Sequence, residues 1–222
     1  DEDDSGTLKY ISIRHGGANI GEGNEINGLT LGALGSKTEV EFIEVIGNQD
    51  DGIEIFGGTV NVKNVVLWNN DDDSIDADMA WNGTIDNFII VVETGGDKCF
   101  ELDGPEGSYV NGNFTIKNGS VSAGSAAGLV DNDPNTNVDM FNIYFFNVKK
   151  GQTFDQTPTV PTNFANFEVT LPEGTTIADF FKDTSADATT AVAKGANTVG
   201  ADKSVFAGWS WTAVAGKLDE FK

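Results

Sequence analysis

Apolar positions repeat along the chain with a period of 22 to 24 residues. In residues 40–79, three apolar residues at Val40, Ile43 and Val45 are followed by an Asn/Asp-rich turn and a short apolar strand at 53–55. The same order returns from Val62 onward. A two-strand unit that returns at a fixed interval is typical of a solenoid. We therefore predict the stacked coils of a parallel β-helix.

The unit occurs seven times along the sequence. Its first apolar position is occupied in turn by Leu8, Val40, Val62, Ile85, Ile116, Met140 and Phe164. Two longer intervals, of 31 and 32 residues, are interpreted as loop insertions, which repeat proteins tolerate. Of the 21 apolar positions in the seven units, all except Gly119 hold Val, Ile, Leu, Met or Phe. The prediction is an all-β, right-handed parallel β-helix over residues 1–171.

One asparagine recurs just before the middle apolar position of each later unit. The five residues are Asn64, Asn87, Asn118, Asn142 and Asn166. Stacked Asn amides can donate and accept hydrogen bonds along a stack of coils. We expect an Asn ladder that begins in the third coil, because Tyr10 and Phe42 hold this position in the first two.

The two ends of the predicted solenoid differ. Residues 172–222 lack the repeat and are predicted to form a C-terminal cap, with a short helix over 176–182, a loose connection over 186–198 and an aromatic strand over 205–211 across the last coil. At the other end the chain enters a coil strand at Leu8, which leaves no room for a cap. We expect either that this is the C-terminal part of a longer protein or that a second chain covers the first coil by head-to-tail association.

Composition narrows the class of partner. The chain has 35 Asp and Glu against 13 Lys and Arg, a formal net charge of −22. Nucleic acid and anionic membranes are therefore poor partners, whereas cations and neutral glycans are better ones. No run of 18 apolar residues predicts a membrane span. The single Cys excludes an intrachain disulfide framework. Strong acidity together with 27 Gly favours an extracellular or outer-surface location.

Acidic residues follow the second strand of successive units. The outward positions of that strand are predicted to be Thr30, Glu54, Asp76, Glu101, Val130 and Asp155. Further acids, Asp50, Asp51, Asp72 and Asp73, lie in the turns before it. Carboxylates at coil spacing repel by about 0.9 kcal/mol in water and about 3.5 kcal/mol at an effective dielectric constant of 20. A Ca²⁺ ion would offset this repulsion, and so would hydration and salt if the column is exposed. Both interpretations stay open.

A second candidate for Ca²⁺ is the segment 131–139. It carries oxygen side chains at alternate positions, namely Asp131, Asp133, Asn135 and Asp139. This spacing suits a loop wrapped round Ca²⁺, although the segment lacks the mid-loop Gly of an EF-hand. An ordinary Asp/Asn-rich turn is the alternative.

Two tryptophans are candidates for contact with sugar. Trp68 follows the last inward residue of its strand and Trp81 lies in a turn, so both could be exposed near the acidic column, with Asp78 beside them. Exposed aromatic rings next to carboxylates are a common platform for sugars. Burial under a neighbouring loop is the alternative.

Four stretches of the chain resemble a known superfamily. They are LKYISIRHGG (8–17), GLTLGALG (28–35), GNQDDGIEIFGG (47–58) and GADKSVFAGWSWT (200–212). Through them the chain resembles the pectin-lyase-like right-handed β-helix superfamily, and more closely the poorly characterised β-helix proteins that Bacteroidota-type bacteria secrete or display. The resemblance implies this fold and a surface location. Members of that group are usually longer at the N-terminus, which agrees with the missing cap.

A shorter resemblance concerns catalysis. The NQDD stretch at 48–51 resembles the Asn-x-Asp-Asp stretch of polygalacturonase-type glycoside hydrolases, in which paired Asp residues act as general acid and base. That family's later Gly-His-Gly and Arg-x-Lys elements have no counterpart here, because the only His and Arg are His15 and Arg14, both upstream. A Ca²⁺-dependent polysaccharide lyase would need a basic proton acceptor, for which Arg14 is awkwardly placed.

Three functions are compatible with these observations. The first is a non-catalytic extracellular or cell-surface protein that binds glycan or a partner, with Ca²⁺ as structural support. The second is a structural, fibre-forming protein that assembles through its uncapped first coil. The third is a carbohydrate-active enzyme, a lyase or a glycoside hydrolase, that uses the acidic face.

Overall fold

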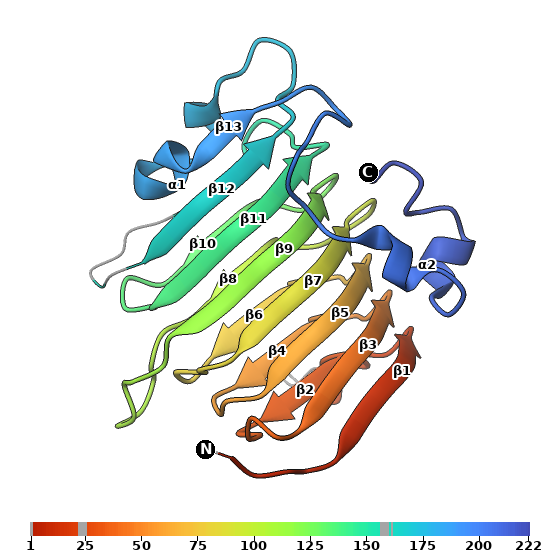
Figure 1. Ribbon diagram of the computed structural model, residues 1–222, viewed down its shortest axis with the longest axis vertical. Coiled ribbons are helices and arrows are strands. Elements are labelled where there is room, and N and C mark those ends of the chain that lie inside the picture. Colours follow the sequence, from red (N-terminus) through yellow and green to blue (C-terminus); the bar gives the residue numbers. More distant parts are fainter. Residues whose placement is uncertain (1, 22–25, 156–159, 161) are drawn as a thin grey trace.

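Two parallel β-sheets wind together along the molecule, as the computed structural model shows for residues 2–21, 26–155, 160 and 162–222 (Figure 1). In this part of the chain the first sheet has the strand order β1-β3-β5-β7-β9-β11-β12-β13 and the second the order β10-β8-β6-β4-β2. Every strand pair is parallel, and the chain alternates between the sheets from β1 to β11. This arrangement confirms the predicted parallel β-helix.

The strands of the first sheet are β1 (Thr7–Arg14), β3 (Glu39–Ile46), β5 (Asn61–Trp68), β7 (Thr84–Val91), β9 (Phe114–Ser122), β11 (Val138–Phe146), β12 (Asn163–Val169) and β13 (Thr189–Ala191). The strands of the second sheet are β2 (Leu29–Gly32), β4 (Ile53–Phe56), β6 (Ile75–Asp78), β8 (Lys98–Leu102) and β10 (Gly128–Asn132). Helical segments lie only towards the C-terminus in the described part: the 3₁₀ helices η1 (Ile177–Asp179) and η2 (Lys203–Phe206), and the short helices α1 (Asp183–Asp187) and α2 (Trp211–Val214).

The first sheet pairs in the register that the apolar repeat predicts. Val62 pairs with Ile85, and Ile116 pairs with Met140. Val62, Ile85 and Met140 are fully buried, so the repeat lines the interior of the solenoid. Gly119 interrupts this line for a steric reason. A Cβ atom at Gly119 would lie 1.9 Å from the ring of Phe88, the residue paired with it in the preceding coil.

The asparagine position bends each long strand. All five predicted ladder residues have φ between 56° and 64°, and Tyr10 and Phe42 share this conformation. The amide nitrogens of Asn87, Asn142 and Asn166 each donate to the Asn one coil before, over 2.8 to 3.1 Å. Asn118 instead donates to Asp86 over 2.7 Å. The amide oxygen of Asn87 already accepts a hydrogen bond from the backbone N–H of Asp202, in place of one from Asn118.

The C-terminal end of the solenoid is closed by Phe180 and Phe181, both buried, and by β13. β13 pairs with β12, whereas the sequence predicted a loose connection there. Of the helix expected over 176–182, only the 3₁₀ helix η1 forms, and α1 begins at Asp183, just beyond that range.

The remaining chain corrects a further prediction. In residues 192–222, called the tail below, the segment 205–211 forms no strand and packs on the first coils rather than across the last one. The tail contains η2 and α2 and runs back over the outer face of the first sheet (Figure 1). The tail buries a second apolar cluster there, which includes Val66, Ile89, Tyr144, Phe206 and Phe221.

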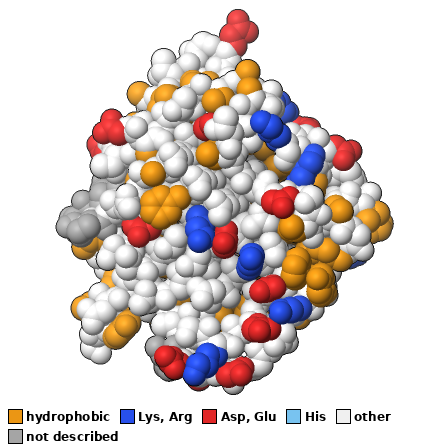
Figure 2. All heavy atoms as spheres, in the orientation of Figure 1, with side chains coloured by type: hydrophobic (Ala, Val, Ile, Leu, Met, Phe, Trp, Pro, Cys, Tyr) orange, Lys and Arg blue, Asp and Glu red, His pale blue; other side chains and the backbone are white. Residues whose placement is uncertain are grey.

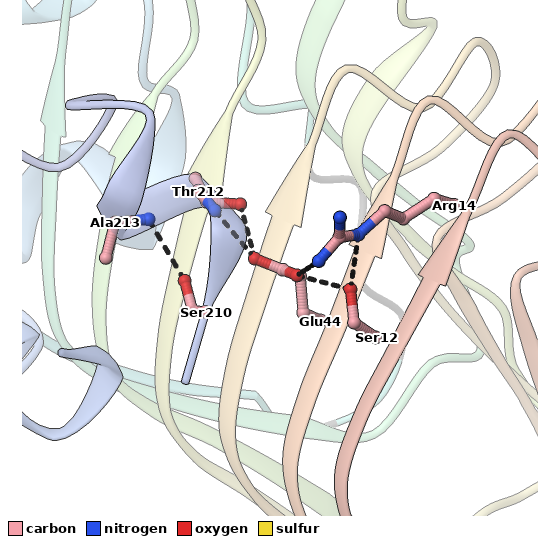
Figure 3. A network of polar contacts seen from close by, with 6 residues as sticks. All are labelled: Ser12, Arg14, Glu44, Ser210, Thr212 and Ala213. Atoms are coloured by element: carbon pink, nitrogen blue, oxygen red, sulfur yellow. Dashed lines mark hydrogen bonds and ion pairs between the residues drawn. The ribbon is translucent and has the colours of Figure 1, made fainter. Parts of the chain in front are cut away.

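Polar side chains on the sheet fix the path of the tail. Buried Glu168 accepts from the N–H and the hydroxyl of Thr198, both over 2.6 Å. Fully buried Glu44 accepts from the N–H and the hydroxyl of Thr212, both over 2.8 Å. Ser12 and Arg14 also donate to Glu44, so α2 is held against the first coils (Figure 3). No described helix is both long and apolar enough to span a membrane.

Candidate functional site

The outer face of the second sheet carries a column of acidic side chains. Glu54 pairs with Asp76, Asp76 with Glu101, and Glu101 with Asp131. The sequence analysis placed Val130 at the fourth position, but Val130 is buried and pairs with Phe100. The register is displaced by one residue because buried Asn132, which pairs with Leu102, takes the second inward position, where the prediction required an apolar residue. The column is therefore longer than predicted.

A second, buried row of acids lies in the turns before these strands. The N–H of Asp73 donates to Asp51 Oδ1 over 3.0 Å, and the N–H of Lys98 donates to Asp73 Oδ1 over 2.6 Å. Asp51 and Asp73 are 7% and 3% exposed. Each carboxylate thus accepts from the next coil, which explains why acids at this position help to order the stacked turns.

The two rows meet at Asp51, Glu54 and Asp76. One carboxylate oxygen from each lies within 4.8 Å of the other two. Asp76 is 8% exposed, and its buried Oδ1 has no hydrogen-bond partner in the described structure. Ca²⁺ binds oxygen at 2.3–2.6 Å, so two oxygens on one ion can lie up to about 5 Å apart. The spacing of these three carboxylates fits a shared divalent cation.

Burial and mutual repulsion disfavour the ionised form of these acids. Burial, aided by the charges of Asp50 and Glu54, raises the pKa of Asp51 to about 8. The pKa of Asp76 is raised in the same direction, first by burial and then by the charges of Asp51 and Glu54. Burial likewise raises the pKa of Glu54. Without a cation, the cluster is therefore disposed to hold protons at neutral pH.

Other predicted metal ligands join neighbouring groups on the same face. Asp50, Asp51 and Asp72 bring oxygens within 4.8 Å of one another, and so do Asp72, Asp73 and Asp97. In the latter group Lys98 Nζ lies 2.7 Å from Asp97, which offsets part of the charge.

A fourth group was not predicted as a metal site, although Asp78 was predicted to lie beside a bound sugar. Asp78, Asp103 and Glu106 also bring carboxylate oxygens within 4.8 Å. Asp103 lies one coil beyond Asp78, since its N–H donates to Ala77 over 2.9 Å. Its position two residues after Glu101 was a usable sequence signal. Glu106 lies in a long insertion, where the repeat offers no register.

The predicted loop site over 131–139 is not assembled. Asp131 belongs to strand β10 and Asp139 to strand β11, while Asn135 donates to the carbonyl of Pro105 over 3.3 Å. In the described chain, no group of three carboxylates close enough to share an ion includes Asp131, Asp133 or Asp139. The segment is a turn, and Asp131 and Asp139 lie on the two different strands that it joins.

The two tryptophans do not flank the acidic face. Trp81 is fully buried, stacks on Phe114 with ring centroids 5.3 Å apart and donates to the carbonyl of Val60. Trp68 lies on the first sheet, where its indole N–H donates to Glu93 over 2.9 Å and Lys217 Nζ lies 5.1 Å from the ring centroid. Both expectations of an exposed sugar platform were wrong, because the interior and the tail cover these rings.

The contacts of Arg14 also lie away from the acidic face. It donates to Ser12 over 2.8 Å and its guanidinium lies 5.4 Å from the ring centroid of Trp211. These contacts place Arg14 in the network that holds α2 (Figure 3).

The family described as "Pectate-lyase like beta helix domain" matches residues 1–213. No curated protein and no solved structure matched the chain in the corresponding searches. The family match covers most of the chain and agrees with the stacked parallel sheets. The chain therefore belongs to the pectate-lyase-like β-helix domain family.

Proposed function

We propose that this chain is a non-catalytic extracellular or cell-surface protein that binds glycan or a partner, and that Ca²⁺ at the acidic face supports its fold. One observation carries the cation part of the proposal. Asp76 Oδ1 is buried without a partner, beside Asp51 and Glu54 oxygens at the spacing of metal ligands. A buried unpaired carboxylate oxygen costs free energy, which an ion would recover.

The donor set favours Ca²⁺ over other metals. The carboxylates of Asp51, Glu54 and Asp76 supply oxygen and neither nitrogen nor sulfur, which suits a hard cation. Glu54 and Asp76 belong to adjacent coils, so a shared ion would join coils that otherwise repel.

Calcium titration tests the proposal. We expect Ca²⁺ to raise the melting temperature relative to EDTA, and to bind with a calorimetric signal. At a free concentration 100 times the dissociation constant, a single site adds about 2.7 kcal/mol to the free energy of unfolding. Asp76→Asn should remove this response and raise the melting temperature in EDTA, since the neutral amide can be buried without taking up a proton or a cation.

The matched control is Asp131→Asn. Asp131 lies in the same column but is exposed and outside the three-carboxylate groups, so the calcium response should persist. An identical melting temperature with Ca²⁺ and with EDTA in the unmodified protein would rule out the structural ion.

A carbohydrate-active enzyme is the second candidate. Burial, with the charges of Asp133 and Glu101, raises the pKa of Asp103 to about 7. A carboxyl group with a pKa near the working pH is what a general acid requires. New reducing or unsaturated sugar ends released from acidic polysaccharides would support this function, and their loss in Asp103→Asn would locate it.

Assembly into fibres is favoured by a different observation. In the described chain, β1 pairs only with β3 and β2 only with β4, so each is the last strand of its sheet. Open parallel edges can accept strands from another chain. Concentration-dependent sedimentation would support assembly, whereas a single species at all concentrations would exclude it.

A further inference from the structure

A groove lies where the tail meets the first sheet. It crosses the carboxyl ends of β7, β9, β11 and β12 and is closed on its other side by residues 215–221. Figure 1 shows the C-terminus beside these strand ends. The groove has a volume of about 650 Å³, within the usual 300–1,000 Å³ of small-molecule sites.

Polar bridges hold the two walls of this groove together. Lys217 of the tail donates to Glu93 at the end of β7 over 2.8 Å. Asn147, at the end of β11, donates to Glu220 of the tail over 3.3 Å and to Ser122 over 2.9 Å. The walls are thus fixed by contacts made before any ligand arrives, which reduces the ordering cost of binding.

The lining combines an apolar floor with balanced charge. Val91, Val148 and Phe221 form buried parts of the floor. The charged lining residues are two acids and two lysines, Glu93, Glu220, Lys149 and Lys217. Glu93 pairs with Lys217, and Glu220 lies 2.5 Å from the Nζ atom of Lys194, outside the lining. On this face of the molecule, Lys and Arg alternate with Asp and Glu (Figure 2), in contrast to the acidic face of the second sheet.

This chemistry selects a class of ligand. The balanced charges leave little net electrostatic field to attract an ion. Their remaining lone pairs and N–H groups can still accept and donate hydrogen bonds. Neutral saccharides present hydroxyl groups that do both, together with C–H surfaces that pack on apolar side chains. We propose that the groove binds a short neutral saccharide. The proposal deepens the glycan-binding part of the proposed function and rests on it, but it does not require the cation.

The test is a titration followed by ¹H–¹⁵N correlation spectra. The probes are maltotriose, cellotriose, xylotriose and mannotriose, with trigalacturonic acid as the charged comparison. For at least one neutral probe we expect saturable shifts of backbone amides in 215–221 and of the Trp68 indole N–H, which donates to Glu93 at the groove. Contacts between sugar protons and the methyl groups of Val148 and Leu171 would locate the ligand without any substitution.

Two adjacent substitutions provide a matched pair. Ala215 lines the groove, whereas Val214 is 68% exposed and is not among its lining residues. Ala215→Trp should weaken binding at least tenfold, and Val214→Trp should leave it unchanged. Absence of shifts with all four neutral probes would overturn the proposal. So would equal binding by both variants, or binding of trigalacturonic acid alone.

Repeating the titration in EDTA and in Ca²⁺ separates this proposal from the cation site. Saccharide binding that persists in EDTA supports the groove even if no ion binds. Calcium binding at the acidic face without any saccharide shift would overturn the groove proposal alone.

Discussion

One backbone position in each long strand through β12 carries a positive φ, and the residue types there show what that conformation requires. Asn is among the few L-residues that adopt it readily, because its short amide can bond locally. Tyr10 and Phe42 adopt it too, with φ of 59° and 57°. Their rings stack with centroids 4.5 Å apart, and Trp209 of the tail packs edge-on against both. Aromatic packing thus replaces the amide hydrogen bonds at this end of the column.

Substitution of Asn142 separates conformation from hydrogen bonding. Asn142 donates to Asn118 and accepts from Asn166. Asn142→Gly keeps the backbone conformation but loses both bonds, whereas Asn142→Ala also pays the left-handed penalty of about 1–2 kcal/mol. We expect Ala to lower the free energy of unfolding by that margin more than Gly, as measured by urea denaturation. An equal loss of unfolding free energy in the two variants would show that the positive φ is not a reason for Asn at this position.

At the scale of elements, the tail behaves as an added layer on the first sheet. It covers outward apolar residues such as Val66, Ile89 and Tyr144, which would otherwise be exposed. Its polar anchors are repeated, since Glu44 and Glu168 each accept from the N–H and hydroxyl of one Thr. Burial alone would raise the pKa of Glu44, but hydrogen bonds from Ser12 and Thr212 outweigh it and hold that pKa below its ordinary value.

Glu44→Ala should release the end of the tail. Removing a charged acceptor leaves the N–H of Thr212 buried without a partner, which costs about 2–3 kcal/mol. Hydrogen exchange should rise in residues 203–222 and stay unchanged in β5, β7 and β9. The control is Glu41→Ala, which replaces a partly exposed residue of the same strand. Faster exchange throughout the sheet would mean that the tail and the solenoid unfold as one unit.

The whole molecule distributes its charge unevenly, and this predicts its response to pH. Asp51, Glu54 and Asp76 have raised pKa values, so the stability they contribute is complete below their unfolded values near 4 and is lost as pH rises through the folded values, about 8 for Asp51. Glu44 has the opposite sign, because its lowered pKa removes stability only as pH falls into the acid range. The two windows do not overlap.

In EDTA we therefore expect the melting temperature to fall between pH 5 and pH 8, by about 2–4 °C for each kcal/mol lost. Saturating Ca²⁺ should flatten this dependence, since the ion replaces the protons. Differential scanning calorimetry at constant ionic strength measures both curves, and Asp76→Asn should show a shallower slope in EDTA. A melting temperature that rises over this interval in EDTA would contradict the buried acidic cluster.

Much of the fold was predictable from local pattern, because the apolar positions of one coil recur every 22 to 24 residues. The interior line from Val40 to Phe164 and the bend at each Asn follow from residues close together in sequence. The acidic column was predictable as far as Glu101. It failed at Asp131, because the buried position after it holds polar Asn132 instead of the apolar residue on which the prediction depended.

The sequence by itself determined the stacking of coils, since each apolar face can be buried only against a neighbour of the same pattern. The tertiary structure alone decided the path of the tail, the burial of Trp81 and which of the predicted acids lie close enough to share an ion. Those outcomes depend on contacts between distant segments, such as Glu44 with Thr212, 168 residues apart. No local period encodes such a contact, because its free energy depends on surfaces that exist only after the solenoid has formed.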